Sequence, residues 1–145
     1  MTSAIIAGIA AVGTLFANPS GKIFVIPSLL IFAIADNIAD TFGMHMYQDA
    51  ELMKEKQVWL STFFNYSARL ATSFIFIGIL LIFPPLVASI LCIAVGLLLL
   101  TLISYAIAKK KKVNPLLMVA EHVGLATGVL ILSAVVGDII RTTIQ

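Results

Sequence analysis

The chain has 145 residues, of which 61% are hydrophobic and 11% charged, with a formal net charge of +2. Its mean hydropathy of +1.10 lies far above that of water-soluble domains, so the composition excludes a soluble globular protein and indicates an integral membrane protein. Four of the nine basic residues form one cluster, Lys109 to Lys112, directly after an apolar run. This pattern is typical of a cytoplasmic membrane edge, and no nucleic-acid partner is expected.

Five transmembrane helices are predicted. Only helices and closed barrels satisfy the backbone inside a bilayer, and the apolar runs lack the alternation of strands. A spanning helix needs about 20 apolar residues. The predicted helices cover residues 3–17, 23–57, 59–83, 86–108 and 115–142. Turn residues separate them at Asn18 to Gly21, at Pro84-Pro85 and at Asn114-Pro115. We therefore expect one all-α transmembrane domain over residues 1–145.

The first helix is short for a full crossing, and no basic residue precedes it, so a removable signal peptide is not expected. The second is longer than a bilayer requires, and its charged end, residues 48–56, is expected to extend into the cytoplasm. One side of the membrane receives Lys54, Lys56 and the lysine cluster. The other side receives only Lys22 and Arg141. The positive-inside rule then predicts a cytoplasmic N-terminus and an external C-terminus, and we take a prokaryotic plasma membrane as the expected location.

Three acidic residues, Asp36, Asp40 and Glu121, fall within the predicted spanning helices. A carboxylate near the membrane centre is costly, so each needs a partner, water or a proton. At a rise of about 1.5 Å per residue, Asp36, Arg69 and Glu121 are expected roughly 10 to 15 Å below the cytoplasmic edge, and Asp40 lies one turn shallower. Arg69 is the only basic residue at this depth, which makes it the natural counter-ion for one carboxylate. Two carboxylates then remain without a counter-ion.

Asp36 and Asp40 are four residues apart, so they share one helix face, which Met44, Tyr47 and Glu51 extend toward the cytoplasm. This face offers oxygen and thioether donors, and a divalent cation would neutralise the surplus negative charge. The methionine sulfur favours Fe²⁺ or Mn²⁺ over Mg²⁺ or Ca²⁺. We expect no tightly bound cofactor, because the metal ion is the transported substrate. The predicted metal ligands are Asp36, Asp40, Met44, Glu51 and Glu121.

Simpler explanations stay open for several residues. Met44 is explained equally well by packing, His45 by a position at the membrane interface, and Asn65 by a hydrogen bond between helices. An isolated buried acid can also take up a proton. Cys92 is expected to be a small buried hydrophobe. The sequence has no phosphate-binding loop, nucleophile elbow or metalloprotease motif, so an enzyme is not expected.

Two further patterns concern packing. Small residues crowd the first helix between Ala7 and Gly13, and Gly124 and Gly128 in the last helix have the four-residue spacing that lets helix backbones approach closely. A neighbouring helix or a second subunit would fit against them equally well. Near the outer end, the three-residue spacing of Asp138 and Arg141 predicts a structural ion pair.

The segment Ala39-Asp40-Thr41-Phe42-Gly43-Met44 resembles the second-helix signature of the vacuolar iron transporter family, commonly Ala-Asp-Gly-Phe-Ser-Met. Shorter matches occur at Ala7-Gly8, Pro84-Pro85 and Gly124 to Gly128. The resemblance implies a five-helix homodimer with the ion path between its subunits, and proton-coupled export of Fe²⁺ or Mn²⁺ from the cytoplasm. It places Asp40 and Met44 on that path, whereas Asp36 matches no family carboxylate.

Two departures from the family pattern matter. The Gly-x-x-Asp-Gly motif that opens the family's first helix is absent here, so either the start is truncated or another acid, such as Asp36, takes over its role. The family's cytoplasmic metal-binding helices are missing too, since only residues 48–58 separate Tyr47 from Trp59. Glu51 and Glu55 are either the remainder of an acidic collar or part of a solvated helix face.

Two other functions stay open. One is a small proton-coupled exporter of organic cations, although Tyr47 is the only aromatic residue noted on the path face, which argues against a cation–π cage. The other is a membrane scaffold without transport, whose acids are protonated or paired with Arg69.

Overall fold

The computed structural model describes residues 2–144, so the two end residues of the predicted domain lie outside the described range. Every regular element in that range is a helix. The short helix α1 (Thr2–Ala17) and a 3₁₀ turn, η1 (Pro19–Gly21), lead into a continuous helical rod. The rod consists of α2 (Lys22–Ile31), a π-helical segment η2 (Phe32–Asp36) and α3 (Asn37–Ala50). The last three helices are α4 (Glu55–Ile82), α5 (Pro85–Lys111) and α6 (Pro115–Ile144).

Four helical segments are long and apolar enough to cross a membrane: Pro19–Ala50, Glu55–Ile82, Pro85–Lys111 and Pro115–Thr143. The apolar helix Thr2–Phe16 is shorter, as predicted for the first helix. The predicted fold class is therefore confirmed: the chain is an all-α membrane protein, and residues 2–144 hold four long apolar helices and one short one.

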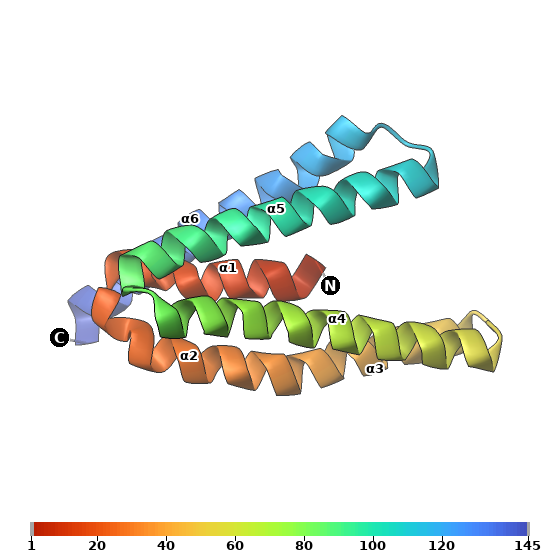
Figure 1. Ribbon diagram of the computed structural model, residues 1–145, viewed down its shortest axis with the longest axis horizontal. Helices are drawn as coiled ribbons and strands as arrows, with labels where there is room; N and C mark the ends of the chain where they lie inside the picture. The colour runs from red at the N-terminus through yellow and green to blue at the C-terminus, as the bar shows by residue number, and fades with distance from the viewer. Residues whose placement is uncertain (1, 145) are drawn as a thin grey trace.

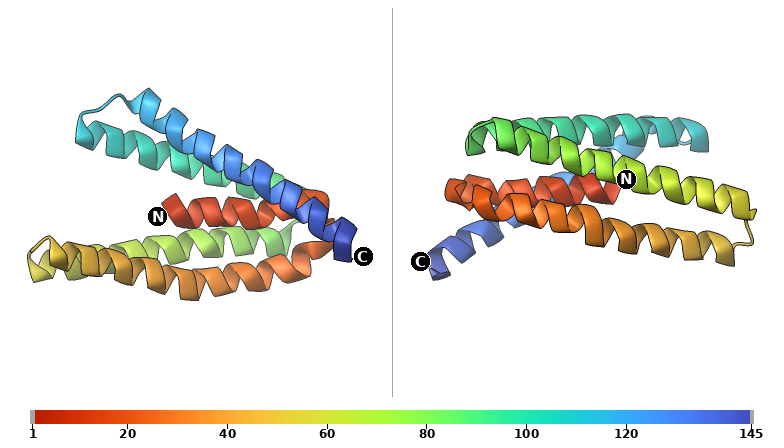
Figure 2. Two further views of the ribbon diagram at one scale, coloured as in Figure 1. Left: turned by 180° about the vertical axis from the view of Figure 1, so that it is seen from behind. Right: turned by 60° about the horizontal axis from the view of Figure 1, so that its bottom comes forward.

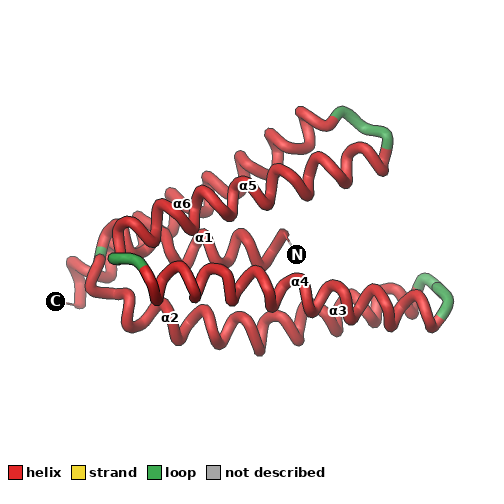
Figure 3. Tube along the Cα trace, viewed as in Figure 1, coloured by secondary structure: helices red, strands yellow, loops and turns green. Residues whose placement is uncertain are grey.

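The helices alternate in direction along the bundle (Figure 1). The α3–α4 and α5–α6 turns lie at one end, and the α1–α2 turn, the α4–α5 turn and the C-terminus lie at the other (Figures 1 and 2). The α3–α4 and α5–α6 hairpins diverge toward the first end, with α1 between them, and only short loops join the helices (Figure 3). The α3–α4 turn, which carries Lys54, and the α5–α6 turn, which carries Lys112, therefore share one end of the bundle, whereas Lys22 lies at the other end (Figure 1). Near the C-terminus, Arg141 donates to Asp138 at 2.7 Å, which confirms the predicted ion pair.

The predicted end of the second helix, at residue 57, is wrong. The helix ends at Ala50 because Leu52 takes a left-handed conformation, with φ of 54°. The amides of Leu52 and Met53 donate to the carbonyls of Asp49 and Gln48 at 3.0 and 3.3 Å, which is the hydrogen-bond pattern of a Schellman cap. Glycine usually occupies the left-handed position of this cap, and because leucine stands there instead, the usual sequence signal for the cap is absent. Glu51 therefore lies in the turn, while Glu55 opens α4, and the two acids do not share a helix face.

Two apolar clusters built around α1 form the core. One joins α1 to α2, α4 and α5 around Phe76 and includes Cys92, which is fully buried as predicted. The other joins α1 to α5 and α6 around Ile9 and Leu100. The short helix α1 thus holds the two diverging hairpins together.

Small residues let α1 and α5 approach α4 closely. A Cβ atom added to Gly8 would lie 2.1 Å from Cε2 of Phe76, and one added to Gly96 would lie 3.1 Å from Cζ of the same ring. Of the two alternatives left open for the small residues of the first helix, the structure shows a neighbouring helix at Gly8. A Cβ atom at Gly124 or Gly128 would meet nothing within 4 Å, so no other helix among the described residues packs closely on them.

Candidate functional site: two aspartates that share one buried arginine

Arg69 of α4 lies between Asp36 and Asp40. Its Nη2 donates to Oδ2 of Asp36 at 2.9 Å, and its Nη1 donates to Oδ2 of Asp40 and to the hydroxyl of Ser3 in α1. The arginine side chain is 1% exposed, whereas those of Asp36 and Asp40 are 50% and 45% exposed. Arg69 is thus the counter-ion, as predicted, but it serves two carboxylates and not one. With both carboxylates ionised, two negative charges against one positive charge leave the group with one net negative charge.

The geometry of the rod sets the position of the two aspartates. The residues of the rod that are buried in the bundle recur every four positions: Val25, Leu29, Ala33, Asn37 and Thr41. Residues four apart drift around a regular α-helix, because it has 3.6 residues per turn, and the wider π-helical turn of η2 offsets that drift. Asp36 and Asp40 each precede a buried residue of this stripe. They therefore lie at its edge, close enough to reach Arg69 while part of each carboxylate stays open.

Polar contacts continue along the interface between α3 and α4. Asn37 donates from Nδ2 to the Tyr66 carbonyl at 3.1 Å, and Thr41 donates from Oγ1 to Oδ1 of Asn37 at 3.3 Å. Asn65 donates from Nδ2 to Oγ1 of Thr41 at 3.5 Å, so its predicted role in bonding helices together is confirmed. Such bonds contribute about 0.6 to 2 kcal/mol each inside a membrane. Together they hold α3 against α4 at the level where Arg69 meets the two acids.

His45 bridges the same two helices nearer the α3–α4 turn. Thr62 donates its only hydroxyl proton to the Val58 carbonyl at 2.8 Å, so Thr62 accepts the hydrogen bond from Nδ1 of His45 at 2.9 Å. The other ring nitrogen, Nε2, lies 3.4 Å from Oδ2 of Asp49. The imidazole also makes an edge contact with Trp59, with 4.8 Å between ring centroids. Nδ1 therefore has a partner within the chain, and Nε2 can pair with Asp49 only when the imidazole is protonated.

The other predicted metal ligands do not all join the acid pair. Met44 continues the Asp36 and Asp40 face of α3 and is exposed. Glu51 lies at the C-cap of α3 and is exposed in the turn. Glu121 is exposed on α6, and no hydrogen bond or ion pair ties its side chain to any of residues 2–144. Helix α6 packs mainly on α1 and α5, and the end that carries Glu121 diverges from α3 (Figures 1 and 2).

The structure thus places Asp36, Asp40 and Met44 on one face and leaves Glu51 and Glu121 elsewhere. Within residues 2–144, no three His, Cys, Asp or Glu side chains lie close enough together to hold a metal ion. The acid pair with Arg69 is therefore the candidate site, and any further ligands for a cation are the methionine sulfur, water or groups from outside this chain.

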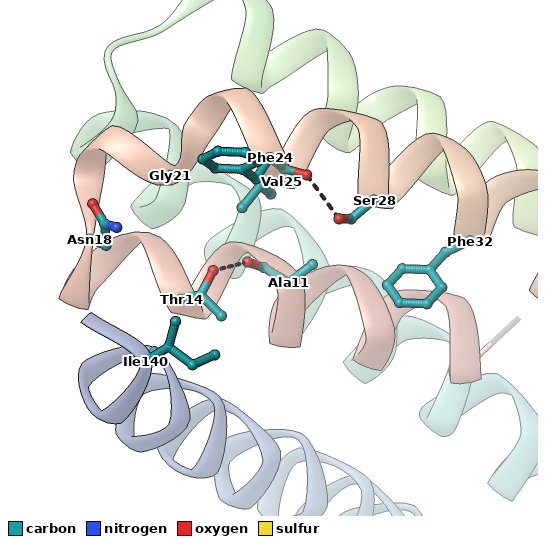
Figure 4. A pocket seen from close by; sticks show the side chains of 10 residues that line it. Ala11, Thr14, Asn18, Gly21, Phe24, Val25, Ser28, Phe32 and Ile140 are labelled. Carbon is teal, nitrogen blue, oxygen red and sulfur yellow. Dashed lines mark hydrogen bonds between the residues drawn. The ribbon is translucent and has the colours of Figure 1, made fainter. Parts of the chain in front are cut away.

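A cavity of about 380 Å³ lies at the end of the bundle that holds the α1–α2 turn, between α1, α2 and α6 (Figure 4). Its two hydroxyl groups are already engaged, since Thr14 donates to the Ala11 carbonyl at 2.7 Å and Ser28 donates to the Phe24 carbonyl at 2.8 Å. Asn18 is the other polar residue of the lining, and no ionisable side chain reaches the cavity. This cavity offers no charged group for binding an ion.

Several polar residues that make hydrogen bonds between helices in the structure were not singled out from the sequence. Ser3 contacts Arg69, Asn37 is buried against α4, and the buried Ser104 hydroxyl lies 2.8 Å from Nδ1 of His122 on α6. Asn37 carried a readable signal, because an amide in an apolar run needs a partner in another helix. The two serines carried none, because a serine in a membrane helix can bond its own backbone equally well.

Comparison with family models, with curated proteins and with solved structures finds no match to this chain. The resemblance to the vacuolar iron transporter family therefore stays a prediction, supported by its short motifs alone. The geometry of Asp36, Asp40 and Arg69 is the remaining basis for assigning a function.

Proposed function

We propose that this protein is a membrane transporter of divalent metal ions, Fe²⁺ or Mn²⁺, which it exports from the cytoplasm in exchange for protons. The observation that carries the proposal is that two aspartates share one buried arginine, which leaves one negative charge unbalanced when both carboxylates are ionised. The two aspartates lie within the apolar segment Pro19–Ala50, and Arg69 lies within the apolar segment Glu55–Ile82. Since a net charge at membrane depth is costly unless it is balanced, the half-exposed carboxylates favour a cation as their missing partner.

The donor atoms on this face suit the proposed ions. Asp36 and Asp40 each give only Oδ2 to Arg69, and their Oδ1 atoms accept no hydrogen bond from residues 2–144. Met44 supplies a thioether one helical turn farther along the same face. Carboxylate oxygens bind hard divalent ions, and a sulfur donor shifts the preference toward Fe²⁺ and Mn²⁺. Protons compete for the same carboxylates, which supplies a means of coupling.

The acid-bearing face is open in a single chain, and carboxylates facing lipid would be unstable. We therefore propose a homodimer in which a second copy covers Asp36, Asp40 and Met44, so that the ion path runs between the two copies. The face of Gly124 and Gly128, on which no other helix of the described chain packs closely, also suits contact with a second copy. The lysine-bearing turns lie in the cytoplasm in this proposal, as in a prokaryotic plasma membrane protein with an external C-terminus.

An exporter of organic cations is the second candidate, and one observation favours it. The carboxylate pair already holds a guanidinium group, that of Arg69, so the site accommodates an organic cation as well as a metal ion.

A thermal-unfolding series distinguishes the candidates. A ligand that binds only the folded protein stabilises it by mass action, by about 2.7 kcal/mol at a hundred times its Kd. We expect Mn²⁺ and Fe²⁺ to raise the Tm of the purified protein more than Mg²⁺ or Ca²⁺ do. The matched control, Asp36→Asn with Asp40→Asn, should lose that shift. A Tm that responds to none of the four metals would contradict metal transport, and a rise with an organic ammonium ion instead would favour the second candidate.

A further inference from the structure

In the candidate site the positive group, Arg69, is buried, whereas the carboxylates of Asp36 and Asp40 are accessible. Arg69 is 1% exposed, yet about half of each partner carboxylate side chain is open. A cation from outside can therefore reach Asp36 and Asp40 while α3 and α4 stay packed. The incoming cation would meet carboxylates that already pair with the guanidinium of Arg69.

The guanidinium holds each carboxylate by one contact. Nη2 contacts Asp36 and Nη1 contacts Asp40, whereas the most favourable arginine geometry places two parallel hydrogen bonds on a single carboxylate. The Nε atom is buried and has no hydrogen-bond partner among residues 2–144. Arg69 is therefore engaged with both acids but saturates neither, and its Nε–H is unused.

Arg69 also has a partner that is not an acid. Nη1 donates to the Ser3 hydroxyl of α1 as well as to Asp40. If Asp40 turned toward another cation, the guanidinium would keep the Ser3 contact and its contact with Asp36. The loss of one carboxylate therefore does not leave the arginine without an acceptor.

We propose that Arg69 is a built-in competitor for the transported ion: it occupies the carboxylate pair of Asp36 and Asp40 in the empty protein and gives up part of that pair when a divalent cation binds. This inference rests on the proposed function. Two like charges on one carboxylate pair repel each other, so the arginine weakens the binding of every cation. The guanidinium repels a divalent ion twice as strongly as a monovalent ion, so removing its charge strengthens the binding of a divalent ion most. Arg69 is in this view a residue that lowers the affinity of the two aspartates for the transported ion and so promotes its release.

Binding of Mn²⁺ to the purified protein tests the inference, with the affinity measured by the loss of the free Mn²⁺ electron paramagnetic resonance signal. An adjacent arginine changes the affinity of a carboxylate for a proton by about tenfold to a thousandfold, and Mn²⁺ competes for the same negative charge. We therefore expect Arg69→Gln to bind Mn²⁺ at least about tenfold more tightly than the wild type. Arg69→Lys should lie between them, because a single ammonium group cannot span both acids as the guanidinium does.

Arg141→Gln is the matched control, because it removes the same charge from a pair with Asp138 at the far end of the bundle and should leave Mn²⁺ affinity unchanged. Equal Mn²⁺ affinity in the wild type and Arg69→Gln would overturn the inference while leaving the proposed function in place. The absence of Mn²⁺ binding in both would overturn the proposed function itself. Should Arg69→Gln fail to fold, wild-type Mn²⁺ affinity in Arg69→Lys would overturn the inference.

Discussion

Removing the charge of one aspartate should destabilise this protein little, whereas removing both should destabilise it strongly. Asp36→Asn or Asp40→Asn alone leaves Arg69 one ion pair and brings the net charge of the group to zero. Because the carboxylates are half exposed, we expect each single variant to lower the free energy of unfolding by no more than about 1 kcal/mol. The double variant leaves a buried guanidinium without a counter-ion, which costs about 3 to 5 kcal/mol.

The effects of the two substitutions should therefore not add. The double variant should exceed the sum of the single variants by at least about 1 kcal/mol, a coupling typical of residues that share one partner. Unfolding can be followed by the fluorescence of the single tryptophan, Trp59, in detergent micelles of fixed composition. Adding Arg69→Gln to the double variant should restore most of the lost stability, because the buried charge is then gone.

Asp138→Asn is the matched control, since it breaks an exposed pair with Arg141 and should cost at most about 1 kcal/mol. A double variant of Asp36 and Asp40 that loses only the sum of its single losses would refute the reasoning. So would a single variant that already loses about 3 kcal/mol or more, because Arg69 would then depend on one carboxylate alone.

Other predictions concern packing and selectivity. Gly8→Ala should cost about 1 to 3 kcal/mol because its Cβ atom would overlap Phe76, and Phe76→Leu should relieve part of that loss; Gly124→Ala, which meets no neighbour, should be neutral or stabilise by up to about 1 kcal/mol. Because the Gly124 face is the proposed contact with a second copy, Gly78→Ala, whose Cβ atom would also meet nothing within 4 Å, serves as the second control. Chemical unfolding measures all of these variants, and equal losses at Gly8 and Gly78 would contradict the packing. Glu121→Gln should leave the Mn²⁺-induced rise in Tm unchanged, and a lost rise would place Glu121 at the site. Met44→Leu should reduce the preference for Mn²⁺ over Mg²⁺ in the same assay, whereas an unchanged preference would remove the sulfur from the site.

Much of the architecture was readable from the sequence because it depends on local signals. Long apolar runs separated by Asn18-Pro19 and Pro84-Pro85 predict helices and their breaks whatever the tertiary packing. The turn after Ala50 was not readable in this way. Its left-handed residue is Leu52, and the usual glycine signal is absent.

The site was predicted in part, for a physical reason. Spacing placed Asp36, Asp40 and Met44 on one face, and counting residues from the membrane edge placed Arg69 at the level of Asp36. Depth along a helix does not determine its rotation or its neighbours, however. Glu121 therefore shared the predicted depth but projects from another part of the bundle, and the burial of Arg69 beneath two half-open acids could not be foreseen.

The most direct test of the account is Mn²⁺ flux into sealed proteoliposomes under an imposed proton gradient. The wild type should carry Mn²⁺ at a rate that depends on the gradient, and vesicles with Asp40→Asn should show no more flux than vesicles without protein. Wild-type vesicles that stay impermeable to Mn²⁺ and Fe²⁺ under that gradient, or Asp40→Asn vesicles that carry Mn²⁺ at the wild-type rate, would contradict the claim that the two aspartates bind and pass a divalent cation.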